Sequence, residues 1–341
     1  MSETTRRPTV KEVAERAGVS PMTVSRTLAG GVNVRPDLQD RVLAAVAELG
    51  YHRNENARSI RPGQSSGLIG VAITNIANPY YSTFALGVEE EADRTGRRIL
   101  LGNTSEDAVR EAQLVNDFLG RRVEGLIVVP TGASWTHLAH AVQSGVPVAL
   151  ASRRIPGLAV DSVVLDDEHG AYEGTAALLD TGHRRIAYLG NMRSIFTGER
   201  RYRGFSRAHE DRGLSVDAAL VPAGQQEVGE AATAMRALLE LADPPTAVFC
   251  ANNRNAIGAV TEIGRQIAEL GRSPADLPGV VSFDDFELSG MMPVPVSVID
   301  HDARALGRQA ARLLLDRLDG RARPAAPREV ELPVVLRRRS R

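Results

Sequence analysis

The sequence has few cysteines, lysines and aromatic residues, and it contains no long apolar run. Its only cysteine is Cys250, which excludes a disulfide within the chain. Lys11 is its only lysine and follows a valine, so the Gly-Lys pair of a phosphate-binding loop is missing and that class of nucleotide enzyme is excluded. No stretch approaches the roughly 18 apolar residues of a membrane helix, and no apolar run precedes residue 9. We therefore expect a cytoplasmic protein without a membrane partner.

The composition is that of a globular chain with a local excess of positive charge. Hydrophobic residues make up 43% of the 341 positions and charged residues 24%, which predicts two or three domains with large cores. The net charge is −1, so the chain as a whole is not a polycation. Residues 1–65 carry ten basic against seven acidic side chains, a net of +3. Any affinity for nucleic acid should come from this segment.

Residues 9–30 have the pattern of two short helices joined by a tight turn. Thr9 followed by Glu12 is the capping-box pattern of a helix start. Gly18 can adopt the positive φ that ends a helix, and Ser20 with Pro21 suits the start of the next one. An apolar stripe at helical spacing runs over both helices: Val10, Val13, Ala14, Ala17, Val24 and Leu28. One face of the second helix stays open, as in a helix that enters a DNA major groove, although periodicity alone fits an ordinary helical hairpin equally well.

The segment that follows predicts a third helix and then a connection. The helix should begin at Pro36 and end near Leu49, but Arg35 at its capping position predicts a weak start. Its expected inward residues are Leu38, Val42, Leu43, Val46 and Leu49. In residues 53–66, Asn54 is suited to cap a helix of six or seven residues, which is too short to persist alone in water. A flexible linker is the simpler interpretation of this stretch.

From residue 68 onward, short apolar strands alternate with amphipathic helices. This alternation predicts an α/β fold of parallel sheets with helices on both faces. The expected strands are 68–73, 98–101, 125–129, 146–150, 162–165, 185–189, 247–250, 279–283, 296–299 and 333–336. They fall into two sets, which indicates a two-lobed binding protein with a crevice between the lobes.

The stretch Val10-Lys-Glu-Val-Ala-Glu-Arg-Ala-Gly-Val-Ser-x-x-Thr-Val-Ser-Arg26 closely resembles the helix-turn-helix of the lactose-repressor (LacI/GalR) family of bacterial regulators. The resemblance implies a three-helix DNA-binding headpiece followed by a core of parallel sheets like that of a periplasmic binding protein. It also implies domain bounds: headpiece 1–52, hinge helix 53–66, and core 67–341, with an N-lobe of about 67–160 and 294–322 and a C-lobe of about 161–293 and 323–341. The chain should cross between lobes at 150–162, 290–296 and 320–326.

The same resemblance implies a homodimer on a palindromic operator. Arg26 should donate two hydrogen bonds to a guanine, and Pro21 and Met22 should touch base edges. Phosphate contacts are expected from Thr9, Ser20, Thr23 and Ser25. The implied hinge helix folds when two copies lie side by side in the minor groove, with an apolar side chain pushed between base pairs. Ile60 stands at that position, where leucine is usual, and the other hinge contacts expected are Asn54, Ala57, Arg58 and Arg61.

Polar side chains follow several of the predicted strands, at the edge where open parallel sheets bind ligands. Arginine, asparagine, aspartate and paired tyrosines there can hydrogen-bond hydroxyl groups and cover a ring face, as a sugar-sized ligand requires. The resemblance assigns effector binding to Tyr80, Tyr81, Ser152, Thr197, Arg201, Asn252 and Asp284. Ser152 and Asn253 depart from the family pattern, which usually has aspartate at both positions. Individually, the asparagines and aspartates could also be helix caps, and the tyrosines could fill the core.

Three functions compete on these grounds. A ligand-responsive repressor uses every feature above, and we prefer it. A periplasmic-type receptor would leave the helix-turn-helix idle, and a sugar-processing enzyme lacks a nucleophile–base pairing. We expect no cofactor and no metal site: His137 and His140 are the only neighbouring histidines, and Asp166-Asp167 with His169 fits a strand end and helix cap better than acid–base chemistry. The last residues show no heptad pattern, which predicts a dimer.

Overall fold

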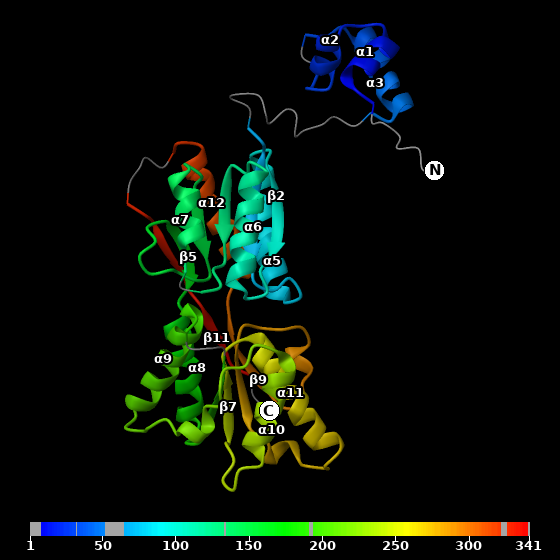
Figure 1. Cartoon of the computed structure of the whole chain (residues 1–341). Coiled ribbons are helices and arrows are strands. Elements are labelled where there is room, and N and C mark those ends of the chain that lie inside the picture. Colours follow the sequence, from blue (N-terminus) through cyan, green and yellow to red (C-terminus); the bar gives the residue numbers. More distant parts are fainter. Residues whose placement is uncertain are drawn as a thin grey trace. The chain divides into compact units, whose positions relative to one another are not determined.

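The computed structural model describes residues 8–31, 33–51, 65–132, 134–190, 194–321 and 326–339. Contacts within the chain divide it into two units, Met1–Ser66 and Gly67–Arg341, and we describe each by itself (Figure 1). The residues expected to form the hinge helix, Asn54, Ala57, Arg58, Ile60 and Arg61, lie outside the described residues.

The first unit contains three helices around a small core. They are α1 (Val10–Ala17), α2 (Pro21–Thr27) and α3 (Pro36–Leu49), which confirms the predicted pattern. Thr9 and Glu12 form the capping box, Gly18 ends α1 with a φ of 64°, and the Ser20 hydroxyl caps α2. The buried apolar residues are Val13, Ala14, Ala17, Val24, Val42, Ala45 and Tyr51.

Two details of α3 differ from or refine the sequence-based expectation. Leu43 was expected inside but is 51% exposed, because it lies one residue, or about 100°, beyond the inward stripe that Val42 and Ala45 define. Arg35 makes no capping hydrogen bond, as expected. Its Nε instead donates to Asp37 Oδ1 at 2.9 Å, on the surface of the helix start.

The N-lobe of the core is a six-stranded sheet in which all pairs are parallel. Its order is β10-β5-β4-β3-β1-β2. The strands are β1 (Leu68–Ile73), β2 (Arg98–Asn103), β3 (Gly125–Val128), β4 (Val148–Ala151), β5 (Asp161–Leu165) and β10 (Glu329–Leu332). Helices α5 (Pro79–Arg94) and α12 (Ala303–Leu318) pack together on this sheet, as do α6 (Ala108–Gly120) and α7 (Thr136–Gln143).

The C-lobe is a five-stranded sheet in the order β11-β9-β8-β7-β6. Its strands are β6 (Ile186–Leu189), β7 (Ala247–Cys250), β8 (Gly279–Phe283), β9 (Val296–Asp300) and β11 (Val335–Arg337), of which only the last is antiparallel to its neighbour. Helix α8 (Asp167–Asp180) packs on α9 (Phe196–Glu210), and α10 (Val228–Leu239) packs on α11 (Asn253–Ala268). Short 3-10 turns lie at Ala218–Leu220, Pro274–Asp276 and Ser289–Met291.

The expected positions of the crossings between lobes were wrong. Strand β5, assigned to the C-lobe, pairs with β4 in the N-lobe, and β9, assigned to the N-lobe, pairs with β8 in the C-lobe. The single strand expected at 333–336 is in fact two strands, one in each sheet, because Pro333 has no N–H to continue a ladder. The described crossings therefore lie at Asp166, at His301–Asp302 and at Pro333–Val334.

Two glycines let α5 and α12 approach closely in the N-lobe. A Cβ added at Gly307 would lie 2.0 Å from the carbonyl oxygen of Phe84, and one at Gly87 would lie 2.1 Å from that of Arg304. Only glycine permits a backbone contact this close. This packing fixes the start of α5, which carries two of the expected effector residues.

Candidate functional site

Helix α2 presents the expected DNA-contacting residues on one side of the first unit. Val24 is fully buried against the other two helices, which fixes the rotation of α2. As a result Pro21 and Arg26 are exposed, and the Met22 side chain is 63% exposed. The Ser20 hydroxyl accepts the backbone N–H of Thr23 at 3.1 Å and lies 2.9 Å from its hydroxyl. The start of α2 is thus an ordered, polar surface that can face a phosphate.

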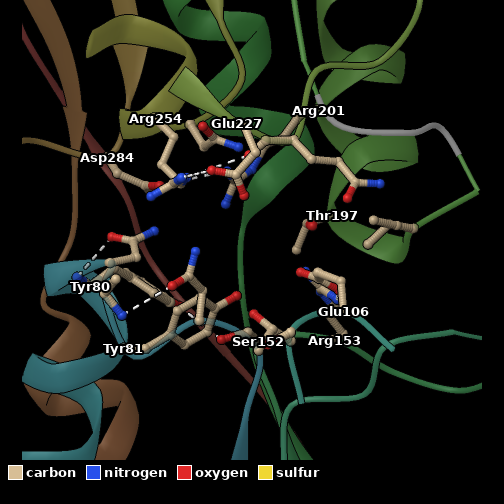
Figure 2. Close-up of a pocket in the computed structure, with 18 of the residues that line it drawn as sticks. Tyr80, Tyr81, Glu106, Ser152, Arg153, Thr197, Arg201, Glu227, Arg254 and Asp284 are labelled. Carbon is tan, nitrogen blue, oxygen red and sulfur yellow. Dashed lines mark hydrogen bonds and ion pairs between the residues drawn. The ribbon is translucent and has the colours of Figure 1, made fainter. Parts of the chain in front are cut away.

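The core contains a cavity of about 360 Å³ where the carboxyl ends of strands from both sheets meet. Figure 2 shows its walls, with side chains from the two lobes pointing toward one another. The structure brings all seven expected effector residues to this one cavity: Tyr80, Tyr81, Ser152, Thr197, Arg201, Asn252 and Asp284. The strand-end interpretation of their place in the fold is therefore confirmed, while their part in binding remains a prediction.

Arg201 is the central cation of the C-lobe wall. Its Nε donates to Asp167 Oδ1 at 2.7 Å and its Nη1 to the carbonyl of Ala251 at 2.5 Å. The guanidinium also lies 3.7 Å from the centre of the Phe283 ring. These contacts hold the side chain in one orientation at the cavity, where an extended arginine would otherwise be mobile.

Asp284 stands beside Arg201 and contacts the crossing between β9 and α12. The closest Arg201 nitrogen is 3.9 Å away, and His301 Nε2 lies 2.7 Å from Asp284 Oδ1. Burial raises the pKa of Asp284, but the charge of Arg201 and the hydrogen bond with His301 outweigh it and lower the pKa below its usual value. Asp284 therefore stays an acceptor at the cavity wall. By contrast, burial raises the pKa of Asp167.

The N-lobe wall holds a second arginine that the sequence did not assign to the site. Arg153 is 4% exposed and binds Glu106 through two nitrogen–oxygen contacts of 2.7 Å, with a further bond of 2.9 Å to the carbonyl of Pro130. Arg254 similarly pairs with Glu227 on the opposite wall. Each arginine that lines the described cavity thus faces a carboxylate. A wall with charges paired in this way suits a neutral ligand rich in hydroxyl groups.

The tyrosine pair covers one side of the cavity. The Tyr80 hydroxyl lies 2.8 Å from Ser152 Oγ, and the rings of Tyr80 and Tyr81 meet edge to face with centres 4.9 Å apart. Burial raises the pKa of both hydroxyls, so both stay protonated. Tyr81 also packs into the core, so core filling and cavity lining are roles of the same residues.

The helix-cap interpretation of the polar residues is confirmed alongside their place at the cavity. Asn252 caps α11 by accepting from the N–H of Asn255 at 2.8 Å, and Asp166 caps α8. Sequence reasoning missed Glu106, Glu227 and Arg254, because they lie in loops or at a helix start without any apolar pattern. The only available signal was their charge.

Two further searches concern metals and membranes. In the part of the chain that the structure describes, no group of three or more His, Cys, Asp or Glu side chains is placed to hold a metal ion. No described helix is both long and apolar enough to cross a lipid bilayer. His137, one of the two neighbouring histidines, is hydrogen-bonded to Glu111 at 2.7 Å.

Comparison with known proteins links both units to one family. Residues 9–54 match the family described as "Bacterial regulatory proteins, lacI family", and residues 66–339 match "Periplasmic binding proteins and sugar binding domain of LacI family". Catabolite control protein A of Priestia megaterium is 31% identical over 307 residues, which cover 90% of this chain and 91% of that protein.

Two solved structures show the same arrangement of elements. The Lac repressor dimer bound to operator and the anti-inducer ONPF has a TM-score of 0.79 and 28% identity, covering 97% of this chain and 98% of that one. The complex of the transcriptional regulator CelR with cellobiose has a TM-score of 0.71 and 26% identity, with 97% and 98% covered.

Proposed function

This chain belongs to the lacI family of bacterial regulatory proteins, and on that premise we propose a repressor that binds a palindromic operator as a homodimer and responds to a sugar-like effector. It is a DNA-binding transcriptional regulator with an effector-binding core. Its place of action is the cytoplasm, at the nucleoid when it is bound to operator. The relatives named above are regulators, and we assign this chain no enzymatic role.

The observation that carries the effector assignment is the cavity between the lobes. Side chains from seven separate strand ends and helix starts meet there, and its arginines are neutralised by carboxylates. Hydroxyl groups can donate to Asp284 and Glu106 and accept from Arg201 and Arg153, which is the chemistry of a sugar. A related regulator with cellobiose bound supports this class of ligand.

The operator assignment rests on the exposed face of α2. We propose that Arg26 reads a guanine, that Pro21 and Met22 touch base edges, and that Thr9, Ser20, Thr23 and Ser25 contact phosphates. Residues 53–66 are proposed as the hinge, with Ile60 as the side chain that enters the minor groove. A change in the spacing of the lobes on effector binding would alter how two hinges meet on DNA.

The function is tested by selecting duplexes from random DNA with the full-length protein, then adding carbohydrates one at a time. We expect pseudo-palindromes to be enriched, and at least one carbohydrate to change their affinity. Arg26→Ala should lose the preference between enriched and random duplexes, because one bidentate contact to a base contributes about 1–3 kcal/mol of discrimination. Thermal stabilisation by the active carbohydrate should persist in that variant.

Two outcomes would overturn these assignments. Failure to enrich any duplex, with or without carbohydrates, would reject the regulator itself. An Arg26→Ala variant with unchanged duplex preference would reject α2 as the reading helix. Lys11→Ala is a suitable control, since it removes a positive charge from α1 of the same unit without touching the exposed face of α2.

A further inference from the structure

Two asparagine side chains join the N-lobe to the C-lobe directly. Asn78 precedes the first residue of α5 in the N-lobe, and Asn253 is the first residue of α11 in the C-lobe. The Asn78 Nδ2 donates to Asn253 Oδ1 at 3.2 Å, and the Asn253 Nδ2 donates to Asn78 Oδ1 at 2.8 Å. The two amides therefore form a reciprocal pair across the boundary between lobes.

The pair is buried, so its two hydrogen bonds depend on how the lobes sit. Asn78 is 7% exposed and Asn253 is 3% exposed. A buried amide that loses its partner without gaining water is costly, and a buried pair with both bonds formed is not. Any movement that separates the two helix starts breaks both bonds at once. The pair therefore favours the spacing of the lobes seen here.

The same two residues also contact the proposed effector site on each side. The Asn78 side chain accepts the backbone N–H of Tyr80 at 3.1 Å. The backbone N–H of Asn253 forms a hydrogen bond with the Asp284 carboxylate. Tyr80 and Asp284 both line the cavity. The amide pair thus connects one cavity residue of the N-lobe with one of the C-lobe.

We propose that Asn78 and Asn253 form a latch that holds the lobes at this spacing, with Asn253 positioning Asp284 for the effector. The regulatory meaning of the Asn78–Asn253 latch rests on the proposed function, but the latch itself involves neither DNA nor effector. An amide on each side is essential, because each supplies one donor and one acceptor. A carboxylate at either position leaves a single bond, and carboxylates at both positions face each other without a donor.

The latch is tested by measuring the distance between lobes in the full-length protein. Spin labels are attached to cysteines introduced at Val109 on α6 and Leu270 after α11, which are 68% and 57% exposed, and labelled protein is diluted with excess unlabelled protein. The native Cys250 is fully buried, so it does not compete for the label. The variants are Asn78→Asp, Asn253→Asp and the double variant. Aspartate keeps the size of asparagine and can still cap α5.

We expect one dominant distance for the wild-type latch and a broader, shifted distribution for each single variant. The double variant should shift by more than the two single variants together, because two carboxylates then repel. Asn253→Ala, which adds no charge, should broaden the distribution like Asn253→Asp. The control is Asn75→Asp, since Asn75 also lines the cavity but bonds only to the neighbouring N–H of Ala77.

A wild-type distance distribution in the double variant would overturn the latch. So would an equal shift in Asn75→Asp, because the effect would then be general charge in the cavity. If the double variant fails to fold, the single variants decide on the same criteria. Because the measurement uses no operator and no carbohydrate, failure of the latch is distinguishable from failure of the proposed function.

Discussion

Arg201 shows how a single side chain can serve both the core and the effector site. It is 7% exposed, pairs with Asp167 and lies beside Asp284. We predict that Arg201→Ala weakens effector binding by about tenfold or more, because a hydrogen bond to a charged group contributes roughly 1.5–3 kcal/mol. Operator binding should remain. A reporter assay with and without the active carbohydrate measures this.

The matched control for Arg201 is its neighbour Arg200, which pairs with Glu331 instead of facing the cavity. Arg200→Ala should respond normally to the carbohydrate. A normal response in Arg201→Ala would reject the assignment of the cavity. Loss of operator binding in Arg201→Ala would show that the substitution unfolds the core, since Asp167 is left buried without its partner.

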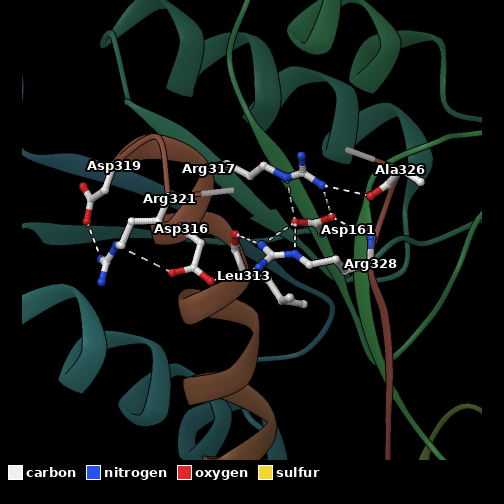
Figure 3. Close-up of polar contacts among 8 residues, drawn as sticks. All are labelled: Asp161, Leu313, Asp316, Arg317, Asp319, Arg321, Ala326 and Arg328. Carbon is white, nitrogen blue, oxygen red and sulfur yellow. Dashed lines mark hydrogen bonds and ion pairs between the residues drawn. The ribbon is translucent and has the colours of Figure 1, made fainter. Parts of the chain in front are cut away.

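Asp161 makes the stability of the N-lobe depend on pH. Its carboxylate lies between Arg317 and Arg328, each with a contact of 2.7–2.8 Å (Figure 3). Burial alone would raise the pKa of Asp161, but hydrogen bonds with the two arginines outweigh it and lower the pKa to about 2. Because the folded pKa is below the unfolded one, this stabilisation is complete above about pH 4 and is lost as the pH falls toward 2.

We therefore predict that Asp161→Asn lowers the melting temperature at pH 7, and that its difference from the wild type shrinks between pH 4 and 2. Thermal unfolding at a series of pH values measures this. Asp180→Asn is the control, since Asp180 is 55% exposed in its pair with Arg212 and such surface pairs contribute little. A constant difference at every pH would show that the Asp161 charge is not what stabilises the lobe.

The sequence could predict which residues reach the cavity when a strand points to them. Arg201 and Asp284 follow recognisable strands or motifs, so their convergence was predictable. Glu106 lies in a loop with a φ of 58°, and nothing in the pattern around it indicates its pairing with Arg153. Pairings across 47 residues depend on the finished fold.

The contact between α5 and α12 depends on the absence of a side chain at Gly307. We predict that Gly307→Ala destabilises the core by about 1–3 kcal/mol, because the new Cβ would overlap the carbonyl of Phe84 and the helices must move apart. Urea unfolding measures the change. The opposite sign is expected for Gly264→Ala on α11, where nothing lies within 4 Å and alanine favours the helix by about 0.5–1 kcal/mol. Equal effects of both substitutions would contradict the close packing.

At the level of elements, the sequence predicted existence well and partners poorly. Strands β1, β7 and β8 occupy the residues expected of them. Strands β5 and β9 were expected in the wrong lobes, because an apolar run reports that a strand is buried and does not report which neighbour it pairs with. Strand β10 was missed because Glu329 and Glu331 interrupt its apolar pattern at the edge of the sheet.

For the whole molecule, charge separates the DNA-binding segment from the rest. Residues 1–65 carry +3 within a chain of net charge −1, which leaves −4 on the remainder. We predict that operator affinity falls at least tenfold between about 50 and 200 mM salt, as counterions are released from DNA. Fluorescence anisotropy with the selected duplex measures this. Carbohydrate affinity should change little, since the cavity charges are paired, and a flat operator curve would contradict phosphate contacts by the first segment.

The three crossings mean that neither lobe is one continuous piece of the chain. Strand β10 completes the N-lobe sheet by pairing with β5, and β11 completes the C-lobe sheet by pairing with β9. Both strands lie within residues 329–337, which leave the ribosome last. The sheets of both lobes are thus finished together at the end of synthesis, so premature termination before residue 329 would yield a product in which both halves lack an edge strand.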